Sequence, residues 1–339
     1  MVVLGIESSC DETSIAVING GRLTANLISS QDFHKLYGGV VPELSSRAHI
    51  QRLQPLLKSA LEQAKITKED IDIVSATAGP GLIGALLTGF VYGKHLAFAL
   101  DKPFIPVNHI EGHIYSGFLM EEKPVFPVLV LVVSGGHTML ILVHSEVKME
   151  ILGSTIDDAV GEAFDKVAKM LGLPYPGGPS IQNAAQNGNP LAYKFPISET
   201  SGKYDFSYSG LKTAVLRMIN KIKTEDEVIS PEAVNDIAAS FQKAAIDALI
   251  IKTGKAIKAH NVHSLSLTGG VAANKLLRES ITNLGQKHSL KVVIPGFEFC
   301  GDNGAMIALR GKMLYEAGER FDDDFEPFPE FYSKYLVNG

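Results

Sequence analysis

The sequence predicts an α/β protein built from two copies of one βββαβαβα unit. Apolar strand patterns and amphipathic helix patterns alternate along the chain, and their order begins again near Pro127. A polar turn joins the first two strands of each series, at 7–12 and at 134–137. Such alternation predicts sheets covered by helices. The two halves share little sequence identity, but the repeated order of strands and helices indicates duplicated domains. A small-molecule site is then expected in the cleft between them.

Length and composition agree with a globular protein of two domains. The chain has 339 residues, of which 45% are hydrophobic and 20% are charged. The net charge of −6 argues against a broad electrostatic attraction to nucleic acid. A protein with this net charge can still have a local basic face. If RNA is the substrate, the protein is expected to need a partner that helps to bind it.

The sequence predicts a cytoplasmic protein with no membrane partner. The longest apolar helical stretch is interrupted by Lys94 and His95, and it falls short of the ~20 residues that span a bilayer. Glu7 stands where a secretion signal would be basic or apolar. The two cysteines, Cys10 and Cys300, make no disulfide framework and suit a reducing compartment as inert thiols.

The first series occupies residues 1–125, the predicted first domain. Pro42 suits the first turn of its long helix, and Pro55 predicts a kink there. In order, the elements are strands 2–6, 13–18 and 23–28, helix 42–64, strand 71–78, helix 82–99, strand 104–107 and a helix that follows Asn108.

The second series occupies residues 126–302, with an irregular insertion at about 172–225 that ends in a short helix. The final helical region, 303–325, is expected to pack back on the first domain. The insertion carries basic residues that suit either a phosphate-binding patch or a solvated helix face: Lys203, Lys212, Arg217, Lys221 and Lys223. The other elements are strands 128–133, 138–143 and 147–152, helices 157–171 and 231–260, strand 264–268, helix 271–284, strand 291–294 and helix 303–317.

His109 and His113 lie four residues apart and therefore share one helical face. Neutral histidines at this spacing can bind a divalent metal, although such pairs are also common as ordinary surface or core residues. Glu111 comes two residues after the first histidine, about 200° round the helix, where it cannot act as the base of a zinc protease. With Asn108 it instead predicts a capping box.

Glycine-rich turns follow several strands and indicate a nucleotide site. Gly79, Gly81 and Gly84 match a dinucleotide-binding pattern, but no acidic residue ends the next strand, so a tight turn is the better interpretation. Backbone amides in three other turns can hold phosphate, and glycine lets a flat ring approach the backbone. These turns are Ser8-Ser9, Ser134-Gly135-Gly136 and Thr268 to Asn274.

Asp302 precedes the last long helix, where it can cap the helix or act as a third metal ligand. As a ligand from the second domain, it would reach the two histidines only across a closed cleft. Two histidines and one carboxylate leave open positions on the ion, which is typical of a catalytic metal site.

Six motifs are distributed over nearly the whole chain: Glu7-Ser8-Ser9-Cys10-Asp11-Glu12-Thr13, Tyr37-Gly38-Gly39-Val40-Val41-Pro42-Glu43, His109-Ile110-Glu111-Gly112-His113, Val133-Ser134-Gly135-Gly136-His137-Thr138, Gly269-Gly270-Val271-Ala272-Ala273-Asn274 and Asp302-Asn303-Gly304-Ala305. Together they resemble the TsaD family, the tRNA adenosine threonylcarbamoyltransferases. The resemblance implies the ribonuclease-H-like fold of the actin, hexokinase and chaperone-ATPase superfamily.

The resemblance also implies particular ligands for particular residues. An iron(II) ion, or zinc, would bind to His109, His113 and Asp302. Many relatives have an acidic residue where this chain has Gln182, which puts a ribose contact from that position in doubt, and Gly301 replaces a usual threonine. The implied substrate contacts are Val132, Val133, Ser134, Gly135, Gly136, Asp165, Gly178 and Asn274.

The expected reaction is acyl transfer from threonylcarbamoyl-AMP to the exocyclic amine of the adenosine after the anticodon, in tRNAs reading codons that begin with A. Glu12 and Asp11 are candidates for the general base, with turn capping as the competing role. The implied partners are tRNA, a paralogue that dimerises with this protein and a P-loop ATPase. The rival hypotheses are a phosphotransferase or nucleotide-driven binding module of the same fold, which leaves the histidines unexplained, and a secreted metalloprotease, which lacks a leader.

Overall fold

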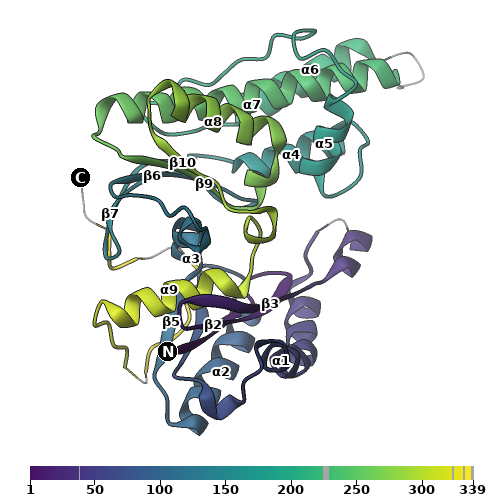
Figure 1. Ribbon diagram of the computed structural model, residues 1–339. Helices are drawn as coiled ribbons and strands as arrows, with labels where there is room; N and C mark the ends of the chain where they lie inside the picture. The colour runs from purple at the N-terminus through teal and green to yellow at the C-terminus, as the bar shows by residue number, and fades with distance from the viewer. Residues whose placement is uncertain (38, 224–228, 323, 331–332, 337–339) are drawn as a thin grey trace. The chain divides into compact units, whose positions relative to one another are not determined.

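Each half of the chain folds around a mixed five-stranded sheet (Figure 1). This computed structural model describes residues 1–37, 39–223, 229–322, 324–330 and 333–336. Gly38, which belongs to the motif from Tyr37 to Glu43, lies outside the described residues. The chain divides into two compact units. Unit 1 comprises Met1–Lys123, Glu146–Lys148 and Pro295–Leu336, and unit 2 comprises Pro124–Ser145 and Met149–Ile294.

The two sheets share one strand order, which confirms the duplicated pattern. The order is β3-β2-β1-β4-β5 in unit 1 and β8-β7-β6-β9-β10 in unit 2. The first strand of each series pairs antiparallel with the second and parallel with the fourth. In unit 1 the strands are β1 Val2–Glu7, β2 Glu12–Asn19, β3 Arg22–Ser30, β4 Ile73–Gly79 and β5 Phe104–Asn108; in unit 2 they are β6 Val128–Val133, β7 Thr138–Ser145, β8 Lys148–Ser154, β9 Ser264–Thr268 and β10 Lys291–Val293.

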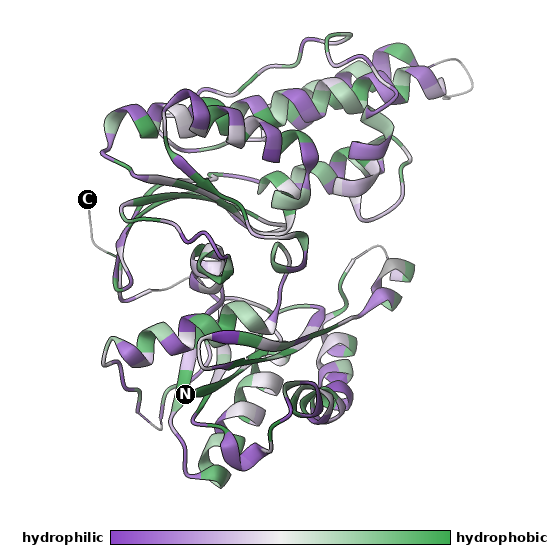
Figure 2. Ribbon diagram, viewed as in Figure 1, coloured by the Kyte–Doolittle hydropathy of each residue, from purple (hydrophilic) through white to green (hydrophobic). Residues whose placement is uncertain are grey.

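The central strands are apolar on both faces because helices cover both faces of the sheet. Every residue of β1 and every residue of β6 is buried, and both strands are strongly hydrophobic in Figure 2. Leu4 and Ile6 pack with Leu53 of α1 (Pro42–Ala64) and with Ala97 of α2 (Ile83–Leu100). These contacts form the core on one side of the unit 1 sheet.

Helix α9 (Gly304–Glu316) packs on the opposite face of the unit 1 sheet. Successive side chains of a strand point to opposite faces, and Gly5 lies between Leu4 and Ile6. A Cβ atom at Gly5 would lie 2.3 Å from the carbonyl oxygen of Gly304 and 2.7 Å from the Cβ of Ala308. Glycine at position 5 therefore lets α9 approach the strand closely. This contact brings the chain just before α9 next to the end of β1.

In unit 2 the predicted insertion contains one helix that the sequence did not reveal, α5. Its sequence opens with two glycines and a proline, which are poor helix signals, but the helix packs between α4 and α7. The short second helix, α6, was expected. The helices of this unit are α4 Val160–Met170, α5 Gly177–Ala185, α6 Ser209–Ile222, α7 Pro231–Ala259 and α8 Lys275–Lys287.

Helix α2 is long and apolar enough, by length and composition alone, to cross a membrane. The mean hydropathy of its 18 residues is 1.4, and 33% of this helix is buried. A helix that packs on the core of a soluble protein passes the same test. Because α2 contributes Ala97 and Phe90 to the interior of unit 1, its apolar character has a packing explanation.

Candidate metal centre and nucleotide pocket

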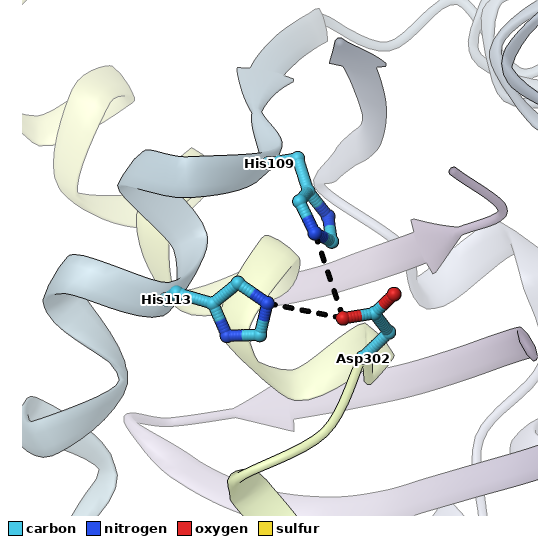
Figure 3. Close-up of side chains that lie close together, drawn as sticks. All are labelled: His109, His113 and Asp302. Carbon is cyan, nitrogen blue, oxygen red and sulfur yellow. Dashed lines mark hydrogen bonds and ion pairs between the residues drawn. The ribbon is translucent and has the colours of Figure 1, made fainter. Parts of the chain in front are cut away.

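Helix α3 (His109–Tyr115) presents both histidines to the same carboxylate (Figure 3). The Nε2 atom of His113 lies 3.0 Å from Oδ1 of Asp302, and Nε2 of His109 lies 3.5 Å from the same oxygen. The ligand atoms of all three residues lie within 4.8 Å of one another. The structure therefore brings together the three residues for which the sequence suggested a shared metal ion.

Asp302 does not cap α9, and its carboxylate contacts both histidines. The cap is Asn303, whose Oδ1 accepts a hydrogen bond of 3.0 Å from the amide of Met306. The alternative in which Asp302 serves as the helix cap is therefore wrong. The side chain of Asp302 is 22% exposed, whereas His113 is fully buried. The cluster thus has a carboxylate that reaches solvent above two enclosed imidazoles.

All three residues belong to unit 1, which overturns the expectation that the metal would join the two halves of the chain. The physical reason is that the chain returns to unit 1 at Pro295, after β10, and brings Asp302 with it. His113 and Asp302 are 189 residues apart in sequence but lie within one compact unit. No closure of a cleft is needed to assemble the cluster.

The predicted capping box of α3 is half correct. Asn108 caps the helix, because its Oδ1 accepts hydrogen bonds from the amides of Ile110 and Glu111. The Glu111 carboxylate instead accepts two bonds from the guanidinium of Arg310, at 2.8 and 2.6 Å. Arg310 is fully buried and also stacks on the ring of Tyr115, 4.2 Å from its centroid. Glu111 therefore ties the histidine helix to α9.

The electrostatics of the cluster favour a cation. Burial by itself would lower the pKa of His109, but the carboxylates of Asp302 and Glu7 raise it to about 9. Burial raises the pKa of Glu12 to about 9, and the negative charges of Asp302 and Asp11 act in the same direction. Several acidic groups thus destabilise one another here unless positive charge is present.

This donor set fits a divalent metal ion of the kind that accepts nitrogen and oxygen ligands. Two imidazole nitrogens and one carboxylate oxygen converge, and the surrounding acidic groups can offset further positive charge. The buried Nδ1 of His113 has no hydrogen-bond partner among the described residues. The other ring nitrogen of His113, Nε2, faces Asp302. The residues present therefore fit the ion that the sequence suggested.

Two residues near the cluster, Glu7 and His49, were not among the predicted site residues. Glu7 ends β1 with its side chain fully buried, and its Oε2 lies 3.2 Å from Nδ1 of His109. His49 of α1 contacts Thr13 Oγ1 at 2.8 Å and the carbonyl oxygen of Cys10 at 3.0 Å, so it holds both ends of the turn that carries Asp11 and Glu12. A charged residue ending an apolar strand signals Glu7, whereas nothing in the sequence singles out His49.

Unit 2 contains a cavity of about 260 Å³ whose walls come from two of the predicted glycine-rich turns, 134–136 and 268–274, together with α4 and the start of α5. A Cβ atom on Gly161 would lie 2.5 Å from the carbonyl oxygen of Ser134, so glycine there lets α4 approach the turn after β6. By contrast, Gly135, Gly178 and Gly270 have open space where a Cβ would be. At these three glycines a ligand in the cavity could therefore approach the backbone closely.

The cavity contains four of the eight predicted substrate contacts: Gly135, Asp165, Gly178 and Asn274. The other four do not line it. The side chains of Val132 and Val133 are fully buried at the end of β6, so only their backbone can reach a ligand. Ser134 Oγ accepts a bond from the amide of His137 within the turn, and Gly136 is exposed.

The polar groups of the cavity already make structural hydrogen bonds. Asn274 caps α8 through the amide of Leu277 and donates to Gln242, which limits its predicted role as both donor and acceptor for a base. Gln182 accepts a bond of 2.8 Å from the amide of Lys275. Asp165 accepts one from the amide of Gly177, while burial raises the pKa of its carboxyl.

The predicted basic patch is only partly exposed. Lys212 is 16% exposed and forms an ion pair with Asp158, so it is not available as a surface phosphate ligand. Lys203, Arg217, Lys221 and Lys223 are exposed. The patch is therefore smaller than the sequence suggested.

Comparison with solved structures supports the predicted fold class. A HypF structure from T. kodakarensis matches 94% of this chain with a TM-score of 0.64 and 17% identity, although the chain spans only 48% of that protein. The activator of the 2-hydroxyisocaproyl-CoA dehydratase from Clostridium difficile, solved with ADPNP, matches 95% of this chain and 99% of its own length with a TM-score of 0.51 and 12% identity. At these identities the likeness concerns the fold alone.

Comparison with sequences identifies the family. Residues 22–309 match the TsaD family, described as tRNA N6-adenosine threonylcarbamoyltransferase. The protein of that name from Thermosipho africanus is 49% identical over 97% of this chain and 99% of its own length. The one from Symbiobacterium thermophilum is 48% identical over 97% and 96%. These matches favour threonylcarbamoyl transfer over the phosphotransferase alternative. The chain belongs to the TsaD family of tRNA N6-adenosine threonylcarbamoyltransferases.

Proposed function

We propose that this protein transfers the threonylcarbamoyl group from threonylcarbamoyl-AMP to the exocyclic amine of the adenosine that follows the anticodon, in tRNAs reading codons that begin with A, and that a divalent metal ion assists the transfer. The adenosine nitrogen attacks the carbamoyl carbon, the bond from that carbon to the phosphate oxygen breaks, and AMP leaves. The family match over most of the chain carries this proposal.

The convergence of His109, His113 and Asp302 supports a metal centre within the transferase. When bound, a divalent ion supplies Lewis-acid stabilisation of the negative charge that develops as the amine attacks. The two imidazoles and the carboxylate would hold it, with iron(II) or zinc as the candidates. Asp11 and Glu12, on the turn that His49 braces, are the candidates to receive the proton released by the amine. Because the pKa of Glu12 is raised to about 9, Glu12 could act as a base at neutral pH only with a cation beside it that lowers this pKa.

The cavity of unit 2 is the proposed site for the adenylate part of the donor. Its open glycine backbones suit a flat ring and a phosphate, and Asp165 is a charged group within reach of a bound molecule. Gly178→Val should fill this open space and weaken binding of AMP, measured by calorimetry. Unchanged AMP affinity in that variant would place the adenylate elsewhere.

A pair of carboxylate variants tests the metal centre. Asp302→Asn keeps the size of the side chain but removes the charge, so the protein should stay folded with reduced metal content and little transfer to tRNA. The matched control is Asn303→Ala, which removes the actual helix cap and should leave metal content unchanged. Full metal content and rate in Asp302→Asn would remove the carboxylate from the centre.

The overall activity is tested in cells by nucleoside mass spectrometry of tRNA after depletion of this protein. Loss of threonylcarbamoyladenosine is expected, and an unchanged level would reject the proposed reaction. Because the target base is stacked in the anticodon loop, it must be turned out to react.

For the tRNA partner, we propose that Arg217 and Lys221 of α6 contact phosphates. Both are exposed on one helix, whereas Lys212 is held by Asp158. Reversing both charges should weaken tRNA binding and reduce its dependence on salt. Lys58→Glu, on an exposed position of unit 1, serves as the control. Equal affinity and equal salt dependence would leave the patch as a solvated helix face.

For the protein partners, we propose a paralogue of the same fold and a P-loop ATPase, in the cytoplasm. The free thiols of Cys10 and Cys300 agree with a reducing compartment. The paralogue is proposed to cover α2, which exposes Ile83 (48%), Leu87 (44%), Val91 (42%) and Phe98 (85%). Val91→Asp should abolish co-elution with the paralogue, and unaltered co-elution would exclude this face.

A further inference from the structure

The carboxylate of Glu7 accepts hydrogen bonds from unit 1 residues other than histidine. Glu7 is the last residue of β1 and is fully buried. The amide of Ser9 donates to its Oε1 at 2.5 Å, and the hydroxyl of Thr77, on the neighbouring strand β4, donates to its Oε2 at 2.5 Å. Each carboxylate oxygen therefore has a donor in unit 1 other than His109, one from the turn after β1 and one from β4.

The same carboxylate determines which nitrogen of His109 carries a proton. Oε2 of Glu7 lies 3.2 Å from Nδ1 of His109, although the residues are 102 positions apart, and the hydroxyl of Ser9 lies 3.3 Å from the same nitrogen. A hydroxyl can either donate or accept, so its presence is compatible with a proton on Nδ1. An ionised carboxylate has only acceptor atoms, so Nδ1 must be the donor in its hydrogen bond to Glu7. The proton on Nδ1 leaves the lone pair of the neutral ring on Nε2. That nitrogen is the one that faces Asp302, at 3.5 Å.

The arrangement is specific to one of the two histidines. His113 also directs Nε2 to Asp302, at 3.0 Å. Its buried Nδ1, however, has no hydrogen-bond partner among the described residues. If the role of Glu7 were only to balance charge near the cluster, its contact with a single ring nitrogen would be unnecessary. The one-sided contact suggests that β1 positions the first ligand of the cluster.

We infer that Glu7 is a positioning residue for the metal centre, because it keeps the proton of His109 on Nδ1 and turns Nε2 towards the ion. This inference rests on the proposed metal centre. Metal-binding histidines commonly donate their other N–H to a carboxylate, and loss of such a partner costs about 10–100-fold in metal affinity. The opposing view is that Glu7 only braces the sheet through Ser9 and Thr77.

Zinc binding by the full-length protein distinguishes these views. Zinc is titrated against a chromophoric chelator, and the imidazole nitrogens of the zinc-loaded protein are followed by ¹⁵N NMR. Glu7→Gln should bind zinc about 10–100-fold more weakly, and the His109 Nδ1–H resonance should shift because its acceptor is no longer charged. Glu7→Asp keeps the charge with a shorter reach and should fall between the two. It also serves as the second variant should Glu7→Gln not fold.

The matched control is Thr77→Val, which removes a hydrogen bond that braces Glu7 but keeps the acceptor for His109. It should lower the melting temperature while its zinc affinity stays within about threefold of the original protein, since the imidazole contact remains. Equal losses of zinc affinity in Thr77→Val and Glu7→Gln would overturn the inference in favour of a structural brace. Unchanged affinity and an unchanged His109 spectrum in Glu7→Gln would overturn it as well.

The Asp302→Asn protein separates failure of this inference from failure of the centre itself. If the original protein and Asp302→Asn bind zinc equally, the centre is absent and the role of Glu7 falls with it. If Asp302→Asn loses zinc while Glu7→Gln retains it with an unchanged spectrum, the centre stands and only the role of Glu7 is rejected.

Discussion

The buried ion pair between Glu111 and Arg310 gives a test of how the histidine helix is held. Arg310 is fully buried, and the side chain of Glu111 is 3% exposed. Glu111→Gln would keep the size of the side chain but leave the guanidinium without a charged partner. Removing one member of a buried pair typically costs about 3–5 kcal/mol. Arg310 retains the carbonyl oxygen of Glu146, at 2.6 Å, and the ring of Tyr115, so we expect about 3 kcal/mol, the lower end of that range.

The assay is denaturant unfolding of Glu111→Gln, Arg310→Met and the double variant. The pair interacts directly, so the double variant should be more stable than the sum of the two losses predicts, by about 1–3 kcal/mol. Metal content should fall with stability in Glu111→Gln, because Glu111 lies on α3 between the two histidines. A loss below about 1 kcal/mol in Glu111→Gln, or strict additivity in the double variant, would refute the idea that this pair anchors the helix.

Three further predictions follow from the contacts around the cluster. Gly5→Ala should destabilise unit 1 by about 1–3 kcal/mol in thermal or denaturant unfolding, because the added methyl meets the carbonyl oxygen of Gly304 at 2.3 Å; no loss would contradict the close packing of α9. Asn303→Ala should cost about 1 kcal/mol in the same measurement, because it removes the cap of α9, and an unchanged stability would show that the cap is dispensable. Zinc affinity should rise by up to about tenfold per pH unit between pH 7 and 9 in calorimetric titrations, because the pKa of His109 is raised to about 9 and its proton competes with the ion; an affinity independent of pH in that window would contradict protonation of His109 there.

The sequence by itself determined the order of the elements and the duplicated pattern. Strands such as 128–133 and 264–268 were predicted with the bounds that the structure shows, because a fully buried strand is a short apolar run between polar turns. Helix α5 was missed, since packing between neighbouring helices stabilises a segment whose glycines and proline do not favour a helix. Periodicity detects elements that bury one face, but not those held by their neighbours.

For the site, the helical spacing of His109 and His113 was visible in the sequence, because two residues four apart share one face of any helix. Spacing carries no information about contacts distant in sequence. Only the tertiary structure shows that Asn303 rather than Asp302 caps α9, that Asp302 belongs to the same unit as the histidines, and that Glu7 faces one ring nitrogen of His109. The physical reason is that the position of Asp302 depends on how closely α9 packs against β1, which the missing side chain of Gly5 allows. The Glu7–His109 contact depends on the parallel pairing of β1, β4 and β5, which brings the ends of β1 and β5 to one edge of the sheet.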